Sequence, residues 1–313
     1  MSVQVDSEGY VTGFVPGERA YRELKHPALS YSLAKSVLSC PEDAWRLTQR
    51  CERVERERTG AMDDGSIVDS ILTSDVAWNE SDCPVQQWTA ATKAPTPSLN
   101  YSDWNGLRIL SCDTLQTKAA KECAADARAN DLTPVLADRF TREVNRAQEM
   151  LVRMELAGFD RRQYMYQVSV YWTEIAANGT KIQCRGRLDF LAHDWGSVVD
   201  LKRVESLDER SLQSAVDRYR WALQAAAYSR AVVMLGQGVP TWYWLFARTL
   251  PVVACTLRPI DATLLQAGEC AWNRAVNDWA EGLATGVWRG HESNHLPIEA
   301  TSWTLAQMEV DLV

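Results

Sequence analysis

The chain has 313 residues, of which 46% are apolar, and a formal net charge of −8. That length suffices for one large domain or two small ones around a sizeable core. No run of 18 apolar residues occurs, and the first residues lack the basic and apolar regions of a signal peptide, which argues against a membrane or secreted protein. We therefore expect a cytoplasmic protein with no membrane partner.

The first half of the chain is expected to be mainly helical. Residues 1–25 read as an extended lead-in, and residues 76–105, rich in Ser, Thr, Pro and Asn, predict a long irregular segment. Helix start signals and apolar spacing predict helices at residues 30–38, 41–48, 64–73, 114–129 and 136–157.

The second half alternates between strand and helix patterns. Helices are predicted at residues 208–235 and 262–284. Strands are predicted at residues 163–172, 182–193, 197–201, 241–246 and 252–257. This order predicts an α/β fold with a central mixed sheet flanked by helices.

Two aspartates and a lysine fall on a predicted hairpin. Asp189 lies in the first strand, while Asp200 and Lys202 share one face of the second, and the turn residues 193–197 lie between the strands. The hairpin places the two carboxylates side by side. Facing carboxylates suit Mg²⁺ or Mn²⁺, and a nearby lysine can hold or protonate the attacking water. The alternative is a solvated surface pair, because Asp-x-Lys is common by chance.

This arrangement resembles the signature of the PD-(D/E)xK nuclease superfamily. Gln224 and Tyr228 follow Lys202 on a predicted helix, are four residues apart and so share one helix face. They resemble the Gln-x-x-x-Tyr element of RecB-like members. An ordinary amphipathic helix is the alternative explanation for these two residues alone.

The N-terminal region resembles the opening of phage RecE-type exonucleases. Ser30-x-Ser32 starts one predicted helix, Pro41 starts the next, and a Gly65-x-x-x-Asp69 helix follows. Asp69 stands where that family usually has a metal-binding histidine. With this departure, the resemblance covers residues 21–250 with its motifs in order.

The resemblance implies a restriction-endonuclease-like PD-(D/E)xK core with an N-terminal helical region. We expect a single nuclease domain over residues 1–313. Its expected parts are a mainly helical N-terminal part, a catalytic sheet and helix, and a C-terminal helix and tail, at residues 1–160, 161–260 and 261–313.

The implied activity is that of a metal-dependent exodeoxyribonuclease. It would digest linear double-stranded DNA from the 5′ end and leave 3′ overhangs for recombination by strand annealing. One alternative is a RecB-like nuclease of different polarity, used in repair or CRISPR adaptation. Another is a non-catalytic DNA-binding subunit with the same fold.

The resemblance also implies roles for the site residues. Asp189 and Asp200 would hold Mg²⁺, or Mn²⁺ in its place, with help from the Leu201 carbonyl and Asp69. Lys202 would activate water. Gln224 and Tyr228 would position the phosphate or Lys202.

Candidate DNA contacts come from two regions. Ser30, Ser32 and Lys35 form a candidate pocket for a 5′ phosphate at a helix start, although plain N-capping explains the serines equally well. Arg185 and Arg187 are candidate backbone contacts, with a solvated surface as the alternative.

The resemblance implies two protein partners as well: a single-strand annealing protein, and further copies of the chain in a ring-shaped homo-oligomer. The net negative charge is consistent with an acidic exterior around an enclosed substrate.

The eight cysteines include no Cys-x-x-Cys pair, which argues against zinc sites and a disulfide framework, so we expect free thiols. Some RecB-like nucleases carry an iron–sulfur cluster held by one early cysteine and a late trio. Only Cys255 and Cys270 lie late here, so we expect no cluster. His193, His291 and His295 show no ligand spacing and are expected to be surface residues.

Overall fold

The computed structural model describes residues 3–16, 26–49, 68, 72, 101–104, 107–130, 132–248 and 252–291. The strands of the main sheet are β1 (Gln4–Val5), β2 (Val11–Pro16), β6 (Tyr164–Ile175), β7 (Lys181–Ala192), β8 (Ser197–Arg203), β9 (Thr241–Arg248) and β10 (Ala254–Pro259). A second sheet contains β3 (Tyr101–Trp104), β4 (Leu107–Leu110) and β5 (Thr133–Leu136).

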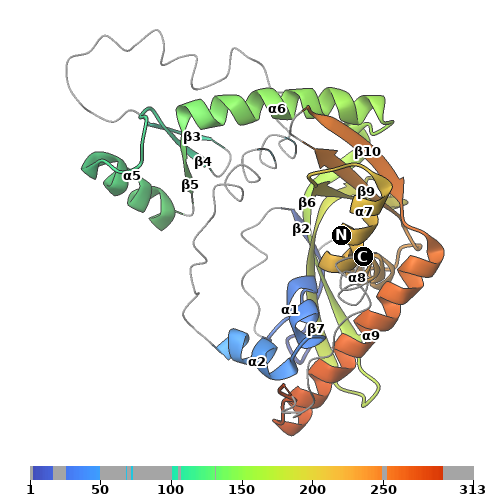
Figure 1. Cartoon of the computed structure of the whole chain (residues 1–313). Coiled ribbons are helices and arrows are strands. Elements are labelled where there is room, and N and C mark those ends of the chain that lie inside the picture. The colour runs from blue at the N-terminus through green and yellow to red at the C-terminus, as the bar shows by residue number, and fades with distance from the viewer. Residues whose placement is uncertain are drawn as a thin grey trace, which may run out of the picture.

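The described helices flank these sheets (Figure 1). They are α1 (Tyr31–Val37), α2 (Pro41–Gln49), α5 (Lys118–Ala129), α6 (Ala137–Leu156), α7 (Glu209–Tyr219), α8 (Trp221–Met234) and α9 (Ala262–Thr285), with a short 3₁₀ helix, η3 (Arg161–Gln163). None of these helices is long and apolar enough to cross a membrane.

The main sheet has seven strands in the order β1-β2-β6-β7-β8-β9-β10. Its neighbouring strands are antiparallel except β8 and β9, which are parallel and are connected through α7 and α8. A parallel pair needs a crossover connection of this kind. The predicted mixed sheet flanked by helices is therefore confirmed.

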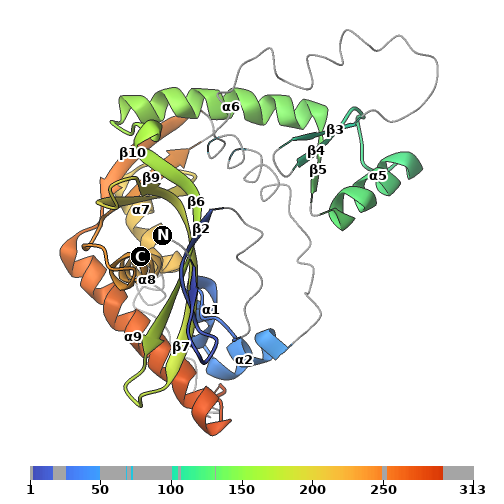
Figure 2. The ribbon, with the colours of Figure 1, turned by 180° about the vertical axis from the view of Figure 1, so that it is seen from behind.

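Each face of the sheet has its own apolar core. One cluster joins the sheet to α1, α2, α7, α8 and α9, with Trp172, Trp242 and Trp272 among its largest members. The other lies beneath α6, which crosses one end of the sheet, and includes Val68 and Leu72 (Figure 1). The small sheet and α5 lie apart at one end of α6 in both views (Figures 1 and 2).

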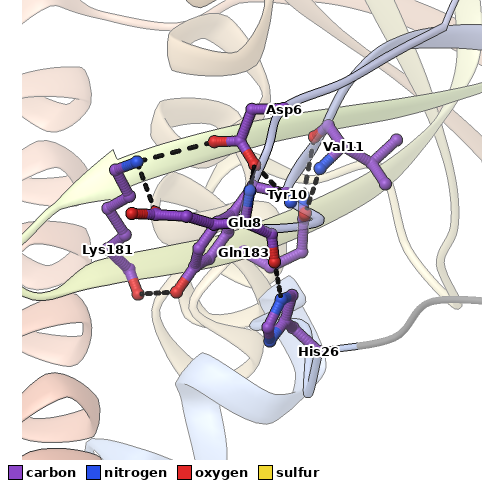
Figure 3. Close-up of polar contacts among 7 residues, drawn as sticks. All are labelled: Asp6, Glu8, Tyr10, Val11, His26, Lys181 and Gln183. Carbon is purple, nitrogen blue, oxygen red and sulfur yellow. Dashed lines mark hydrogen bonds and ion pairs between the residues drawn. The ribbon is translucent and has the colours of Figure 1, made fainter.

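A glutamine side chain holds the N-terminal hairpin in place (Figure 3). Gln183 of β7 accepts a hydrogen bond from the Val11 amide at 2.6 Å and donates one to the Val11 carbonyl at 2.9 Å. At the same end, Lys181 pairs with Glu8 at 2.6 Å, and His26 stacks on Tyr10 with ring centroids 4.5 Å apart. Val11 belongs to the predicted extended lead-in at residues 1–25, and its two hydrogen bonds with Gln183 fix it to the sheet.

The predicted helix over residues 208–235 is wrong in one respect, because the chain forms two helices there. Arg220 ends α7 and precedes α8 in the left-handed conformation, with φ of 55°. A single left-handed residue breaks the i to i−4 ladder, and nothing in the local composition signals it.

Two further differences lie in the N-terminal half. Residues 101–104, predicted to be irregular, form β3, and β4 and β5 were not predicted either. Tertiary pairing decides such short strands, which carry little periodicity of their own. Most of the predicted helix at residues 64–73 lies outside the described residues, although Val68 and Leu72 are helical and buried.

Replacing Gly186 by alanine is expected to destabilise the protein. A Cβ there would lie 2.6 Å from the ring of Tyr228, which packs beside Trp242. We expect a loss of about 1–3 kcal/mol in the free energy of unfolding, measured by urea denaturation. Gly238→Ala is the matched control, because a Cβ at Gly238 would meet no atom within 4 Å. Equal stability of the two variants would contradict the packing argument.

Candidate active site

The strands β7 and β8 separate where the two aspartates lie. Their pairing is limited to Phe190 with Val199 and Leu191 with Val198. Continuing this register would place Asp189 opposite Asp200. Instead of a further main-chain pair, the Leu201 amide donates a hydrogen bond to Oδ2 of Asp189 at 3.0 Å. A carboxylate thus takes the place of a main-chain acceptor at the point of separation.

The neighbouring strand β6 is distorted at the same level. Tyr166 pairs with Phe190 and Val168 pairs with Leu188, but no pair is formed by Gln167, whose φ is 47°. Val168 and Leu188 belong to the core beside α8 and α9, whereas Phe190 belongs to the core beneath α6. At this level, side chains two residues apart on the same strand therefore point to opposite faces of the sheet. In a regular strand they would point to the same face.

Gln167 also contacts the site. Its Nε2 atom donates a long hydrogen bond of 3.5 Å to Oδ1 of Asp189. Its Oε1 atom is buried and has no hydrogen-bond partner among the described residues. A left-handed non-glycine residue costs free energy and is often found at functional sites. Sequence analysis missed Gln167, and no motif marks it.

Gln224 links the carboxylate of Asp200 to the ammonium of Lys202. Its Nε2 atom donates to Oδ1 of Asp200 at 2.8 Å, and its Oε1 atom accepts from Nζ of Lys202 at 2.8 Å. The ammonium of Lys202 also forms an ion pair with Oδ2 of Asp200 and lies 5.3 Å from the ring centroid of Trp221. One amide therefore contacts both groups.

Burial dominates the electrostatics of the two aspartates. The pKa of Asp200 is raised to about 7, mainly by burial, with the charge of Lys202 opposing the shift and the negative charge of Asp189 adding to it. Burial also raises the pKa of Asp189, against the opposing charges of Lys202 and Arg187 and the hydrogen bond from Leu201. The two carboxylates are therefore costly to ionise together without a further positive charge.

The donor set fits a hard divalent cation. Asp200 is only 2% exposed, and its buried Oδ2 atom forms an ion pair with Lys202 but no hydrogen bond with the residues that the structure describes. Two carboxylates and a neighbouring main-chain carbonyl such as that of Leu201 are oxygen ligands of the kind that Mg²⁺ and Mn²⁺ prefer. A cation here would offset the cost of ionising both acids.

The helix α1 is anchored beside this site. The Leu29 amide donates to the Gln183 carbonyl at 2.8 Å, and the Arg185 amide donates to the Leu29 carbonyl at 3.1 Å. Tyr31 follows, and burial with the charge of Asp200 raises its pKa to about 12. Tyr31 was not singled out from the sequence, although it lies between Ser30 and Ser32 of the proposed motif.

The predicted phosphate-binding residues differ in their surroundings. Ser30 caps α1 by accepting a hydrogen bond from the Leu33 amide, and its hydroxyl lies 3.1 Å from that of Ser32. Ser32 is exposed, and Lys35 lies 5.6 Å from the ring centroid of Tyr31. The capping alternative therefore describes Ser30 in this structure, while Ser32 faces solvent.

The remaining predicted residues lie in different surroundings. Arg187 lies close enough to Asp189 for its charge to lower the pKa of that acid. Tyr228 packs against Gly186 and Trp242, one helical turn beyond Gln224. Asp69 lies outside the described residues. Its neighbour Val68 is buried in the same cluster as Phe190 and Val199, which flank the two aspartates.

Comparisons with known proteins place this arrangement in a family. No curated protein is significantly similar to the chain in sequence. A candidate exonuclease from Eubacterium rectale superposes with a TM-score of 0.47 at 15% identity, covering 89% of this chain and 92% of its own. The crystal structure of SSO0001 gives a TM-score of 0.25 at 12% identity, covering 50% of this chain and 67% of its own. The family described as "PDDEXK-like domain of unknown function (DUF3799)" matches residues 30–247. The chain therefore belongs to this PDDEXK-like family, which confirms the predicted PD-(D/E)xK nuclease fold.

Proposed function

We propose that the protein is a Mg²⁺-dependent exodeoxyribonuclease that digests linear duplex DNA from the 5′ end and leaves 3′ overhangs. The observation that supports this most is the group of Asp189, buried Asp200 and half-buried Lys202 where two strands separate, with Gln224 bridging the last two. An Asp–Lys pair on the surface would be solvated and would contribute little to stability, whereas this pair includes a buried carboxylate and is bridged by an amide. Family membership supports a nuclease; metal identity and polarity are proposals.

The side chains divide the work of phosphodiester hydrolysis. Asp189 and Asp200 would hold the divalent cation, with the Leu201 carbonyl as a further oxygen ligand. A cation bound there would supply positive charge that stabilises the attacking hydroxide and the departing 3′ oxygen. The ammonium of Lys202 would orient the attacking water and can donate a proton from Nζ to the departing 3′ oxygen, and Gln224 keeps that ammonium in place. Tyr228 supports β7 from the next turn of the same helix.

The DNA strand would approach over α1 and β7. Ser32 and Lys35 contribute a hydroxyl and an ammonium for a terminal 5′ phosphate, with Ser30 fixing the start of α1. Arg185 and Arg187 contribute charge along the strand that carries Asp189. We also propose a single nuclease domain, a ring-shaped homo-oligomer and a single-strand annealing protein as partner, each of which the RecE-type resemblance suggests.

The polarity of digestion tests the proposal. Linear duplexes labelled at either end should lose the 5′ label first in the presence of Mg²⁺, and EDTA should stop the reaction. A 5′ phosphate should speed digestion several-fold over a 5′ hydroxyl, because an anion pairs with Lys35. Ser32→Ala and Lys35→Ala should shrink this difference, whereas Lys118→Ala, on exposed α5, should not.

Other outcomes point to the alternatives. Release of the 3′ label first would favour a RecB-like nuclease of different polarity. Efficient nicking of covalently closed circles would exclude an exonuclease. DNA binding without any cleavage, over a range of divalent metals, would favour a non-catalytic subunit.

Asp69 gives a separate prediction for the metal. If its carboxylate joins Asp189 and Asp200, Asp69→Ala should raise the Mg²⁺ concentration for half-maximal cleavage by about tenfold, as expected for losing one ligand. Asp69→His should restore activity best with Mn²⁺, because imidazole suits softer ions than Mg²⁺. Asp194→Ala, in the exposed turn between β7 and β8, is the control. An unchanged metal titration for Asp69→Ala would exclude Asp69 as a ligand.

A further inference from the structure

A second group of metal-ligand side chains lies where α2 meets the chain after α9. Cys40 immediately precedes α2, Asp43 lies in its first turn, and His291 follows α9. One ligand atom from each of the three lies within 4.8 Å of the others. None of these residues belongs to the proposed nuclease site.

The three side chains differ in exposure and are already in contact. Cys40 is 4% exposed, and its thiol lies 3.9 Å from the Arg289 carbonyl oxygen, a weak hydrogen bond. Nε2 of His291 lies 3.0 Å from Oδ2 of Asp43. The side chains of Asp43 and His291 are 57% and 75% exposed, so the group is closed by the thiol on one side and open to solvent on the other.

Contacts of other residues hold the two segments together. The chain turns at Gly286, which ends α9 with φ of 72°. Trp288 then stacks on Trp45 of α2 with ring centroids 4.6 Å apart. The Glu42 amide donates to the Arg289 carbonyl at 3.0 Å. These contacts place His291 beside the start of α2, and none of them involves the side chain of His291.

We propose that Cys40, Asp43 and His291 form a zinc-binding site. A thiolate, a carboxylate and an imidazole are the ligand types that Zn²⁺ accepts together, whereas Mg²⁺ prefers oxygen alone. Ligands around a tetrahedral zinc ion lie about 3.3–3.8 Å apart, from bond lengths of about 2.0–2.3 Å. No two of the ligand atoms are more than 4.8 Å apart, and those of Asp43 and His291 are 3.0 Å apart, so rotation of these two exposed side chains can bring the group to that spacing.

The ligand types distinguish this site from an iron–sulfur cluster. Iron–sulfur clusters are held by at least two thiolates, and this group has one. The expectation of no zinc site rests on the lack of Cys-x-x-Cys pairs, and the expected surface position of His291 rests on the lack of ligand spacing around that histidine. The fold instead combines one cysteine with an acid and a histidine about 250 residues away, a separation that local spacing does not reveal.

Bound zinc would tie the N-terminal helices to the segment after α9. Both α1 and α2 contact α9, and the three lie side by side beside the end of β7 away from α6 (Figure 2). A metal that binds only the folded chain stabilises it in proportion to its occupancy. Removal of zinc should therefore lower the unfolding temperature by about 5 °C.

The test is zinc analysis of the full chain, purified without a histidine tag and dialysed against metal-free buffer after loading with zinc. We expect one zinc ion per chain in the wild type, and none in Cys40→Ser or His291→Ala. Cobalt in place of zinc should give a thiolate-to-metal charge-transfer band, which the carboxylates of the nuclease site cannot produce. Cys270→Ser, on the exposed face of α9, and His193→Ala are the matched controls and should keep both signals.

Two outcomes would overturn the proposal. One is wild-type protein that retains no zinc and shows no cobalt–thiolate band. The other is zinc that Cys40→Ser and His291→Ala retain as fully as the controls do. If Cys40→Ser does not fold, the exposed His291→Ala decides between these results, together with Asp43→Asn.

Discussion

Lys202→Met is expected to slow DNA cleavage by about 10³-fold, in line with removing a group that handles the proton and the attacking water. Methionine keeps the length of the side chain but cannot donate to Gln224 or pair with Asp200. The measurement is single-turnover digestion of a linear duplex at saturating metal. Saturation matters because Lys202 also lowers the pKa of Asp200 and so favours metal binding.

The control for this variant is Lys181→Met, which removes a lysine at the exposed end of β7 that pairs with Glu8. It should cleave DNA at the wild-type rate. DNA affinity should change little in either variant, because one phosphate contact is a small part of backbone binding. Cleavage by Lys202→Met within tenfold of wild type would remove Lys202 from the proposed chemistry.

In the metal-free protein, the free energy of unfolding of Asp200→Asn relative to wild type should be higher at pH 8 than at pH 5. The pKa of Asp200 is raised from 3.8 to about 7 in the folded chain, so the folded state binds more protons than the unfolded state between these values. Stability from this group is complete below pH 3.8 and is lost as the pH rises through 7. Each pH unit in this window corresponds to about 1.4 kcal/mol, so wild type should lose about 2–3 kcal/mol between pH 5 and pH 8.

Asparagine at this position is neutral at all these pH values, so the variant lacks that loss. The measurement is urea denaturation in EDTA at pH 5 and pH 8, with Asp194→Asn, in an exposed turn, as the control. Mg²⁺ should cancel the advantage of Asp200→Asn at pH 8, because the ionised wild-type acid then has a counter-charge. A stability difference between wild type and Asp200→Asn that is independent of pH would contradict the raised pKa.

The sequence predicts the fold correctly where the alternation of apolar residues along the strands and the turn residues between them indicate the same pairing of neighbouring strands. Alternation and turn residues predicted the hairpin of β7 and β8, and with it the approach of Asp189 to Asp200. The resemblance to RecB-like nucleases implied that Gln224, on a helix, would position Lys202. These inferences succeed because each rests on a short-range period or on one connection between neighbouring elements.

The missed features have another physical origin. Gln167 and Arg220 adopt left-handed conformations that neither residue type favours, so only the surrounding packing determines them. The strands of the small sheet are four residues long, which is too short for a reliable period. Tyr31 reaches the site because Leu29 attaches to β7, a contact across more than 150 residues of chain.

Because Asp189 accepts a hydrogen bond from the Leu201 amide, it has a structural role between two strands that Asp200 does not have. A descendant of this fold that had abandoned catalysis could exchange Asp200 and Lys202 for apolar residues, since each mainly satisfies the other and Gln224. At residue 189 the same descendant would still need a side-chain oxygen, or the Leu201 amide would lose its acceptor. Inactive relatives should therefore keep Asp or Asn at this position after the rest of the constellation has gone.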